Sequence, residues 1–295
     1  MAGSCDDSIV HYTRQELISE DKKYAAAHLN ETDETRVNAI AEIRRWIEEN
    51  DDLPSQIDNF FILRFLRVCK FDLGKTKARM QNYYKQRSDL SKWYMNKDPF
   101  QPELQEFFNL GSILSLRKPD SQGRLVIIVR ATRHDPRRHE LSNLIKVALA
   151  VIEVAIKHYP AASVYGCALF IDVANPTIRH VGQLRPYIIK NIVHAWQGCY
   201  PIRIQSISMI NAPEYVEIVL KIFRSFMTEK MRNRLHVYTQ NMMHNCFKDI
   251  PDNILPVEYG GTNGTLQELI GYWKKLVEEN RDWITENEND RTVSK

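Results

Sequence analysis

The sequence lacks the features that mark membrane-spanning, secreted and nucleic-acid-binding proteins. It has no run of about 18 apolar residues, so no transmembrane helix is expected. Its first residues have neither the basic flank nor the apolar core of a secretory signal, and Ala2 stands where N-myristoylation requires glycine. With 40 basic and 37 acidic residues, the formal charge is only +3. This balance argues against nucleic acid as a partner and makes any basic surface a local one.

Cysteine is also scarce. The five cysteines are scattered and odd in number, and no Cys-x-x-Cys pair occurs. This pattern predicts reduced thiols and a cytoplasmic protein. The nine histidines show no metal-ligand spacing, so neither a metal nor another cofactor is expected.

The usual motifs of catalysis are missing as well. The sequence contains no Gly-x-Gly-x-x-Gly, P-loop, His-Glu-x-x-His or Gly-x-Ser-x-Gly motif. Gly260 and Gly261 are read as a turn because no Lys-Ser or Lys-Thr follows them. Asp172 ends an apolar run, where many α/β enzymes place a carboxylate, but no local Ser or His accompanies it. Capping of the next turn is favoured, and no catalytic residue is assigned.

The first third of the chain has a helical pattern. Residues 1–35 are polar and acidic and are expected to be partly disordered, with a short helix around 13–29. Apolar residues then recur at helical spacing, which predicts a small helical unit over residues 36–94. Its expected helices cover residues 37–50, 60–68 and 75–93.

Within the second of these helices, Asp58 is the expected N-cap. Arg64 and Arg67 are three residues apart, which places them together on the face opposite the apolar one.

From residue 95 onward the pattern changes to alternating strands and helices. Short β-branched runs occupy residues 124–130, 165–173, 205–210 and 234–238, and helical stretches at 142–158, 181–196 and 214–226 lie between them. This alternation predicts an α/β domain with a mostly parallel sheet over residues 95–262. Residues 263–295 are expected to form a helix at 266–279 and a tail that frays from Arg281.

Two of the helical stretches are unusually apolar. Residues 142–158 are apolar on nearly every side, which predicts a buried helix. An ordinary core helix is the simpler interpretation, and a helix lining an apolar cavity is the alternative. Residues 213–227 combine an apolar stripe with Lys221 and Arg224 at its edge. This suits either a lid at a membrane interface or an ordinary packed helix.

A basic group follows the second of these helices. Lys230 and Arg234 are four residues apart on one helical face, and Arg203 precedes the adjacent strand. A phosphate-headgroup site and a solvated surface are both consistent with this spacing.

At this point four segments, in the same order, resemble the CRAL-TRIO lipid-binding family. They are Phe61-Ile-Leu-Arg-Phe-Leu-Arg67, Tyr200-Pro-Ile-Arg-Ile-Gln-Ser-Ile-Ser-Met-Ile-Asn-Ala-Pro213, Phe226-Met-Thr-Glu-Lys-Met-Arg-Asn-Arg-Leu-His-Val237 and Leu255-Pro-Val-Glu-Tyr-Gly-Gly261. The resemblance covers residues 36–275 and is greatest to the branch of α-tocopherol transfer protein and cellular retinaldehyde-binding protein.

The resemblance implies a helical N-terminal region packed on an α/β lipid-binding domain with a mobile gate helix at residues 213–227. It implies a gate whose membrane-facing residues are Tyr215, Val219, Ile222, Phe223 and Phe226. The implied ligand pocket is lined by Ile145, Ala148, Ile152, Cys167, Ile171, Ile192, Ala195 and Trp196.

The implied pocket departs from that of the tocopherol carrier. Ala148 and Ile152 stand where that carrier has serine, and Trp196 is bulkier than its counterpart. These departures favour a ligand that needs less polar anchoring than tocopherol.

The resemblance also implies a phosphoinositide headgroup site made by Arg203, Lys230 and Arg234, with Lys70 as a further contributor. Cys69 and Gln205 stand where the tocopherol carrier has arginine, so weaker or altered phosphoinositide binding is expected.

The function implied is that of a cytoplasmic monomer that carries one hydrophobic ligand, such as a retinoid, tocopherol or carotenoid, and transfers it during transient contact with anionic membranes. A phosphoinositide-responsive adaptor is the alternative. A hydrolase-like enzyme is disfavoured because the nucleophile elbow is missing.

Overall fold

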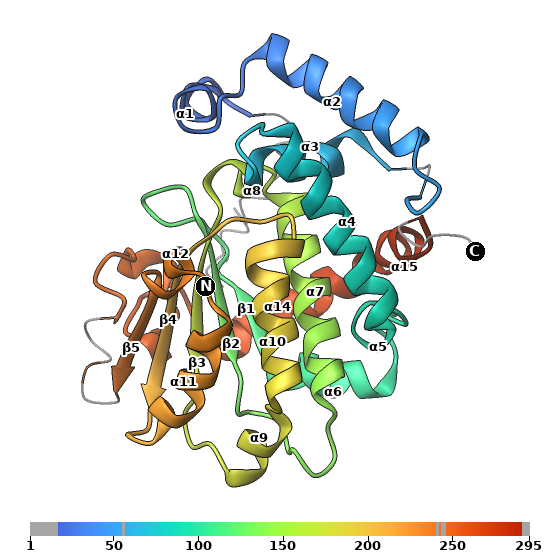
Figure 1. The fold of residues 1–295 in the computed structure, drawn as a ribbon. Coiled ribbons are helices and arrows are strands. Elements are labelled where there is room, and N and C mark those ends of the chain that lie inside the picture. The colour runs from blue at the N-terminus through green and yellow to red at the C-terminus, as the bar shows by residue number, and fades with distance from the viewer. Residues whose placement is uncertain (1–16, 55–56, 240–241, 243–245, 291–295) are drawn as a thin grey trace.

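A computed structural model describes residues 17–54, 57–239, 242 and 246–290 of the chain (Figure 1). Helices of the N-terminal third pack on a domain in which a five-stranded sheet is covered by helices. The fold class expected from the alternation of strands and helices is confirmed.

The N-terminal third is helical. Its helices are α1 (Ser19–Leu29), α2 (Asp33–Glu48), α3 (Asn59–Val68), α4 (Leu73–Asp89), α5 (Ser91–Tyr94) and α6 (Pro102–Leu110). The predicted N-cap is present, because the Asp58 carboxylate accepts a hydrogen bond of 2.8 Å from the Phe61 amide. The short helix expected around residues 13–29 is found as α1, whose Ala25 and Leu29 are buried against Val164.

The sheet has the strand order β1-β2-β3-β4-β5. Its strands are β1 (Ile113–Ser115), β2 (Leu125–Arg130), β3 (Cys167–Asp172), β4 (Ile204–Ala212) and β5 (Leu235–Thr239). Strand β1 pairs antiparallel with β2, and the other three pairings are parallel. The predominance of parallel pairing follows from the helical crossovers between successive strands.

Helices connect the strands and cover the sheet. They are α7 (Leu141–His158), α8 (Ala162–Tyr165), α9 (Ile178–Gln183), α10 (Pro186–His194), the π-helical turn η1 (Ala195–Cys199), α11 (Val216–Phe226) and α12 (Glu229–Arg232). The single helix expected over residues 181–196 is in fact interrupted, because α9 ends at Gln183 and Pro186 occupies the first turn of α10.

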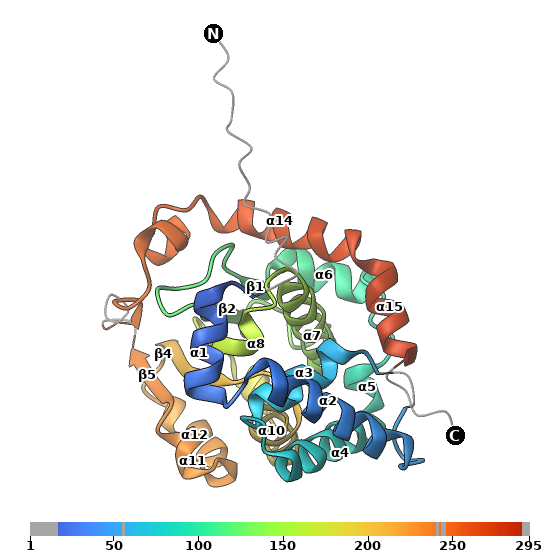
Figure 2. The same cartoon turned by 90° about the horizontal axis from the view of Figure 1, so that it is seen from above.

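The chain then returns behind the sheet. The turns η3 (Asp252–Ile254) and η4 (Val257–Tyr259) lead into α14 (Leu266–Glu279) and α15 (Arg281–Asp290). Seen from above, α10 and α11 lie on one side of the sheet and α14 on the other (Figure 2). Phe247 from this segment stacks on Phe170 of β3, with ring centroids 4.7 Å apart.

The C-terminal residues differ from their prediction. The tail expected to fray forms α15 over residues 281–290, with Ile284 buried. The Glu288 carboxylate accepts hydrogen bonds from the amides of Asn96 (2.6 Å) and Lys97 (2.9 Å). This helix is therefore held to the loop that joins α5 to α6.

The two arginines of α3 are also placed differently from a solvated helical face, because both are buried. Arg64 forms two hydrogen bonds, of 2.8 and 2.9 Å, with the Glu153 carboxylate of α7. The Tyr200 hydroxyl also donates to Glu153, and burial beside this carboxylate raises the pKa of Tyr200. Arg67 pairs in the same two-pronged manner with Glu31. The Arg64–Glu153 pair joins the N-terminal helices to the α/β domain.

Removing one partner of this pair should be costly. Glu153→Ala leaves the Arg64 guanidinium buried without its carboxylate, and we expect it to lower the free energy of unfolding by about 3–5 kcal/mol. Replacing both residues, as Arg64→Met with Glu153→Leu, should cost less than Glu153→Ala alone.

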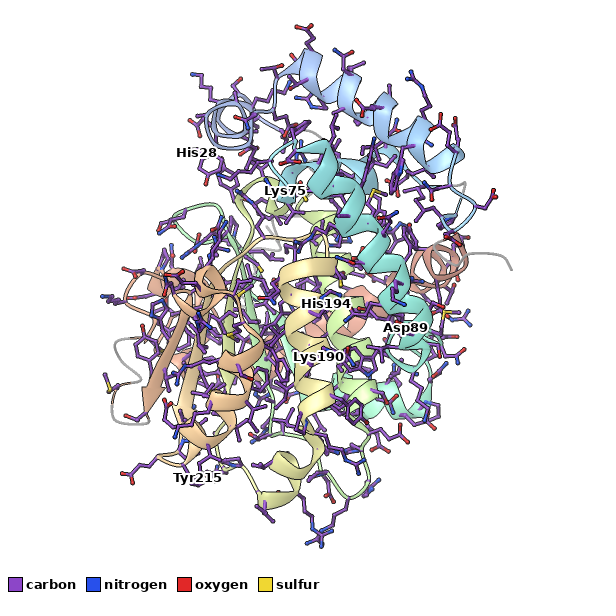
Figure 3. All side chains as sticks on the ribbon, in the orientation of Figure 1. His28, Lys75, Asp89, Lys190, His194 and Tyr215 are labelled. Atoms are coloured by element: carbon purple, nitrogen blue, oxygen red, sulfur yellow. The ribbon has the colours of Figure 1, made fainter. Side chains whose placement is uncertain are left out.

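Urea denaturation monitored by circular dichroism measures these differences. The control is Asp89→Ala, which removes the exposed i,i+4 pair between Lys85 and Asp89 at the end of α4 (Figure 3) and should cost less than about 1 kcal/mol. A cost for Glu153→Ala no larger than that of the control would contradict the assigned role.

Candidate functional site

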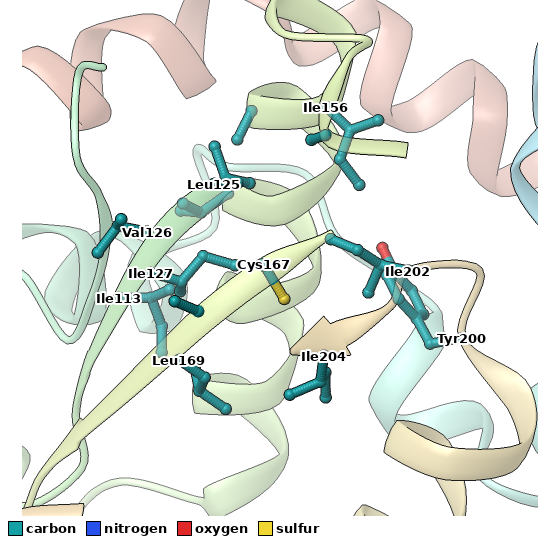
Figure 4. Close-up of a cluster of buried hydrophobic side chains, with 14 of the residues drawn as sticks. Ile113, Leu125, Val126, Ile127, Ile156, Cys167, Leu169, Tyr200, Ile202 and Ile204 are labelled. Atoms are coloured by element: carbon teal, nitrogen blue, oxygen red, sulfur yellow. The ribbon is translucent and has the colours of Figure 1, made fainter. Parts of the chain in front are cut away.

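An apolar cavity of about 300 Å³ lies between the sheet and the helices α7, α10 and α11. On the sheet side its wall is made by alternate residues of the strands, because side chains of a strand alternate between faces. Cys167, Leu169 and Ile171 of β3 form the centre of this wall. Figure 4 shows Cys167 and Leu169 in one cluster of buried hydrophobic side chains with Ile202 and Ile204, and all four line the cavity.

The helical wall contains the other residues of the predicted pocket. Ile145, Ala148 and Ile152 lie three and four residues apart on one face of α7 and line the cavity. Behind them, Val147 and Val151 are fully buried in the core. Helix α7 is therefore both a core helix and a cavity helix. One of its sides packs in the core, and the other lines the cavity.

All eight residues of the predicted pocket lie on the cavity wall. They are Ile145, Ala148, Ile152, Cys167, Ile171, Ile192, Ala195 and Trp196. Apart from Cys167 they are only half-buried although they face the interior, because the cavity leaves part of their surface uncovered.

Helix α11 closes one side of the cavity. Tyr215, Val219 and Phe223 line it, and the Phe223 ring stacks on Trp196 with centroids 6.2 Å apart and planes at 20°. Ile222 and Phe226, which the resemblance grouped with these residues, do not line the cavity; they are half-buried against the hydrophobic core.

The C-terminal end of α11 is held by the side chain of Gln197. Its amide nitrogen donates to the Phe226 carbonyl, and its oxygen accepts from the Thr228 amide, both at 3.0 Å. The turn η1, which carries Gln197, is held in turn by Arg79 of α4, which donates to the carbonyls of Gln197 (2.9 Å) and Tyr200 (2.7 Å). Burial lowers the pKa of Arg79. The N-terminal helices therefore contact the end of α11 through η1.

The N-terminal end of α11 lies beside exposed apolar side chains. Ile218 and Tyr215 of this end are 69% and 51% exposed, and Ile178 of α9 is 83% exposed. The Tyr215 hydroxyl donates to the Pro176 carbonyl at 3.4 Å, which places α9 next to α11 at the lower end of the molecule (Figures 1 and 3). We call Ile178, Tyr215 and Ile218 the apolar patch. Ile178 was missed in the sequence because it lies alone between polar neighbours.

The predicted headgroup residues lie at the opposite end of α11, beside α12. Burial lowers the pKa of Lys230, and the positive charges of Arg234, Lys70 and Arg203 lower it further, so the four side chains share one region. We call these four residues the basic cluster. Lys70 and Lys230 are exposed, whereas Arg203 and Arg234 are half-buried and donate to the Val164 and Ile204 carbonyls.

The two positions that depart from the family pattern contribute no positive charge. The Gln205 amide donates to the Tyr165 carbonyl at 3.1 Å. Cys69 is half-buried, and burial raises the pKa of its thiol.

The carboxylate of Asp172, which lies where many α/β enzymes place a catalytic group, is hydrogen-bonded within the protein. Asp172 accepts hydrogen bonds from the Ala174 amide (3.0 Å), the Asn211 amide group (2.8 Å) and the Tyr259 hydroxyl (2.8 Å). This is the turn-capping role favoured by the sequence. The turn read at Gly260 and Gly261 is also present: Gly260 has φ +84°, and a Cβ on Gly261 would lie 2.1 Å from the Leu255 carbonyl oxygen.

Two further features bear on the site. Within the described ranges, no group of three His, Cys, Asp or Glu side chains could hold a metal ion. No helix in this part of the chain has the length and apolar character needed to cross a membrane.

Comparison with known proteins agrees with this architecture. The chain is 28% identical to "Alpha-tocopherol transfer protein-like" from Mus musculus over 265 residues, which cover 89% of this chain and 75% of that protein. It is 29% identical to "Clavesin-2" from Homo sapiens over 250 residues, which cover 83% of this chain and 75% of that protein. The solved structure "Crystal structure of Sfh5" shares the fold, with a TM-score of 0.56 at 14% identity, covering 86% of this chain and 92% of that one.

Two family models match the chain, one for each part of the structure. The Pinta-like UBA domain matches residues 32–104, which hold α2 to α5 and the start of α6. The CRAL/TRIO domain matches residues 109–261, which hold the sheet, α11 and the cavity lining apart from Trp93 and Tyr94. Because this second match covers more than half of the 295 residues, the chain belongs to the CRAL/TRIO family.

Proposed function

We propose that this protein is a cytoplasmic carrier that encloses one hydrophobic lipid-like molecule and transfers it at membranes, without acting as an enzyme. The observation that carries the proposal is the apolar cavity closed by α11. This helix presents Val219 and Phe223 to the cavity and Ile218 to the outside. A ligand in this cavity contacts apolar side chains of both the sheet and the helices, as a poorly soluble molecule requires.

The energetics explain why release needs a trigger. Burying about 400 Å² of apolar ligand surface contributes roughly 10 kcal/mol at about 25 cal/mol per Å², before the cost of ordering. Such a ligand leaves slowly unless α11 moves. Moving α11 uncovers Val219, Phe223 and Trp196, which a bilayer accommodates better than water does. Membrane contact therefore favours the open state.

We further propose that anionic headgroups, such as those of phosphoinositides, bind the basic cluster. Lys230 lies near three other positive charges, and an anion placed among them would relieve their repulsion. Because the cluster adjoins α12, which follows α11, headgroup binding would act at one end of the gate. The protein is proposed to act as a monomer.

The first experiment is native mass spectrometry of the full chain purified from eukaryotic cells, followed by extraction and identification of bound molecules. We expect one lipid or isoprenoid per chain. If the protein carries no such molecule and takes up none from a mixed lipid extract, the carrier function is wrong. A phosphoinositide-responsive adaptor would then be favoured, provided that the protein still binds anionic vesicles.

The apolar patch provides a second test. Ile178→Asp with Ile218→Asp places two charges where α9 and α11 would enter the bilayer interface. We expect membrane-stimulated transfer of a fluorescent lipid to fall at least about tenfold, because each isoleucine contributes about 1.5–3 kcal/mol when buried. The bound lipid per chain should not change, since neither residue lines the cavity.

The matched control is Val37→Asp. Val37 is another β-branched apolar residue, 66% exposed, and lies on α2 at the other end of the molecule (Figure 1). It should leave transfer unchanged. Equal transfer rates for the patch variant and this control would exclude the patch from membrane docking.

The basic cluster is tested with its two exposed lysines. Lys70→Glu with Lys230→Glu should weaken binding to vesicles that contain phosphatidylinositol bisphosphate by about tenfold or more at low salt, because each lysine near an anionic surface contributes about 1 kcal/mol. The difference should shrink as salt is raised. Vesicle sedimentation measures it. Lys85→Glu, on the exposed face of α4, is the control. A variant that binds as tightly as this control at low salt would rule out the headgroup site.

A further inference from the structure

Three histidine rings lie together where the loop after β2 meets α9. His134 and His139 belong to this loop, residues 131–140, and His180 belongs to α9. The centroid of the His134 ring lies 4.9 Å from that of His180 and 6.3 Å from that of His139. Because His134 and His180 also line the cavity, the contact between this loop and α9 forms part of the cavity wall.

Three hydrogen bonds hold the loop to α9. Nε2 of His180 lies 3.0 Å from the His134 carbonyl oxygen, and Nε2 of His134 lies 2.8 Å from the Gln183 side-chain oxygen. The Gln183 amide nitrogen donates to the His139 carbonyl at 2.8 Å. Pro176, just before α9, accepts the hydrogen bond of the Tyr215 hydroxyl. Any opening of the loop from α9 would therefore occur beside α11.

These bonds determine which nitrogen of each ring carries the proton. The oxygen atoms that face Nε2 of His134 and of His180 can only accept, so both Nε2 atoms are donors. Nδ1 of His180 accepts a hydrogen bond of 3.1 Å from the Thr177 amide, as part of the N-cap of α9. Both rings are therefore neutral in the closed contact.

Neither ring has a suitable place for a second proton. A protonated Nδ1 is a donor, and in His180 it would oppose the N–H of Thr177 and break the N-cap. Nδ1 of His134 is buried and has no partner in the described part of the chain, so a proton there would add an uncompensated charge to the interior.

The carboxylates on the surrounding elements do not compensate such a charge. Most already have partners within the protein: Glu106 of α6 (His139), Asp135 (the Arg137 amide), Glu140 (Ser142), Asp172 of β3 (Asn211) and Glu217 of α11 (Arg224). Glu214, at the start of α11, is exposed. The loop and the segment that holds α9 also carry several arginines: Arg133, Arg137, Arg138, Arg179 and Arg185.

The two states of the contact therefore bind different numbers of protons. Burial lowers the pKa of His134, and positive charge on His180 or His139 lowers it further. When the contact opens, the ring enters water, where a histidine has a pKa of about 6.5 and takes up a proton. The closed state is thus favoured above about pH 6.5 and loses this advantage as the pH falls below that value.

We infer that the contact between residues 131–140 and α9 is a proton-sensitive closure of the cavity, which acid opens beside α11 so that the ligand is released faster. This inference rests on the proposed carrier function and specifies how that function is regulated. An anionic bilayer supplies acid locally, since its negative surface potential concentrates protons about threefold to sevenfold.

The first test needs no ligand. Hydrogen–deuterium exchange of the full chain is compared at pH 7.5 and 5.5, after correction for the intrinsic effect of pH on exchange. We expect the amides of residues 176–184 to lose protection about tenfold, the effect of one proton taken up on opening. Helix α14, on the other side of the sheet, should stay protected (Figure 2). Unchanged protection of residues 176–184, or a parallel loss in α14, would overturn the inference.

The rings are tested with His134→Gln and His180→Gln together, which removes both titrating groups and keeps a side-chain donor at each position. The loss of protection at pH 5.5 should disappear in this variant. The matched control is His28→Gln, which removes an exposed histidine of α1 far from α9 (Figure 3) and should keep it. If circular dichroism shows that the double variant does not fold, each single variant should reduce the loss. A full loss in both would contradict the assignment.

Release is measured separately. The protein is loaded with all-trans-retinol, whose hydroxyl does not ionise in this range, and is mixed with excess uncharged phosphatidylcholine vesicles. We expect retinol to leave about tenfold faster at pH 5.5 than at pH 7.5, and at similar rates in the double variant. A rate independent of pH in the unaltered protein would overturn the inference and leave the carrier function intact. If the chain takes up no lipid at all, the carrier function fails and the release step with it, and exchange alone then decides whether acid opens the contact.

Discussion

The fold is constrained by the need to keep an apolar cavity in its interior. At about 24 cal/mol per Å³, a cavity of about 300 Å³ forgoes on the order of 7 kcal/mol of contacts unless an apolar molecule fills it. The surrounding structure must compensate for this. The fully buried core of Val147 and Val151 behind α7, and the buried pair of Arg64 and Glu153 above it, hold the cavity wall from outside. The side chains that face the cavity can then differ without loss of core packing, because other residues hold the wall.

The N-terminal helices support this wall and also reach the gate. Arg79 of α4 donates to the carbonyl of Gln197 in the π-helical turn η1 and to the carbonyl of Tyr200, which follows this turn. From the same turn Trp196 stacks on Phe223, while Gln197 holds both sides of the turn that ends α11. One short segment therefore contacts the helical unit, the apolar cavity and α11. In the proposed mechanism, a displacement of α11 would break these contacts with η1, so the closed gate would be a discrete state.

Local patterns predicted elements well and contacts poorly. Runs such as residues 205–210 identified β4, whereas β1 has only three residues, Ile113–Ser115, and no alternation to recognise. Helix α15 was missed because its Asn- and Glu-rich composition hides one buried isoleucine. The burial of Arg64 depends on Glu153, 89 residues away. The residues of the cavity wall came from family resemblance, since periodicity alone does not distinguish a core-facing residue from a cavity-facing one.

In the proposed mechanism, the two ends of α11 would both contribute to opening. The apolar patch lies at its N-terminal end and the basic cluster beyond its C-terminal end. Burying Ile178 and Ile218 in a bilayer contributes about 3–6 kcal/mol at most, because both are already partly covered. Shifting a gate from about 1% to 99% open needs roughly 5.5 kcal/mol. The patch alone is barely sufficient, and an anionic headgroup at the basic cluster adds about 1 kcal/mol per lysine. If α11 is the proposed gate, it would open fully only at a bilayer that is also anionic, and release would be restricted to such membranes.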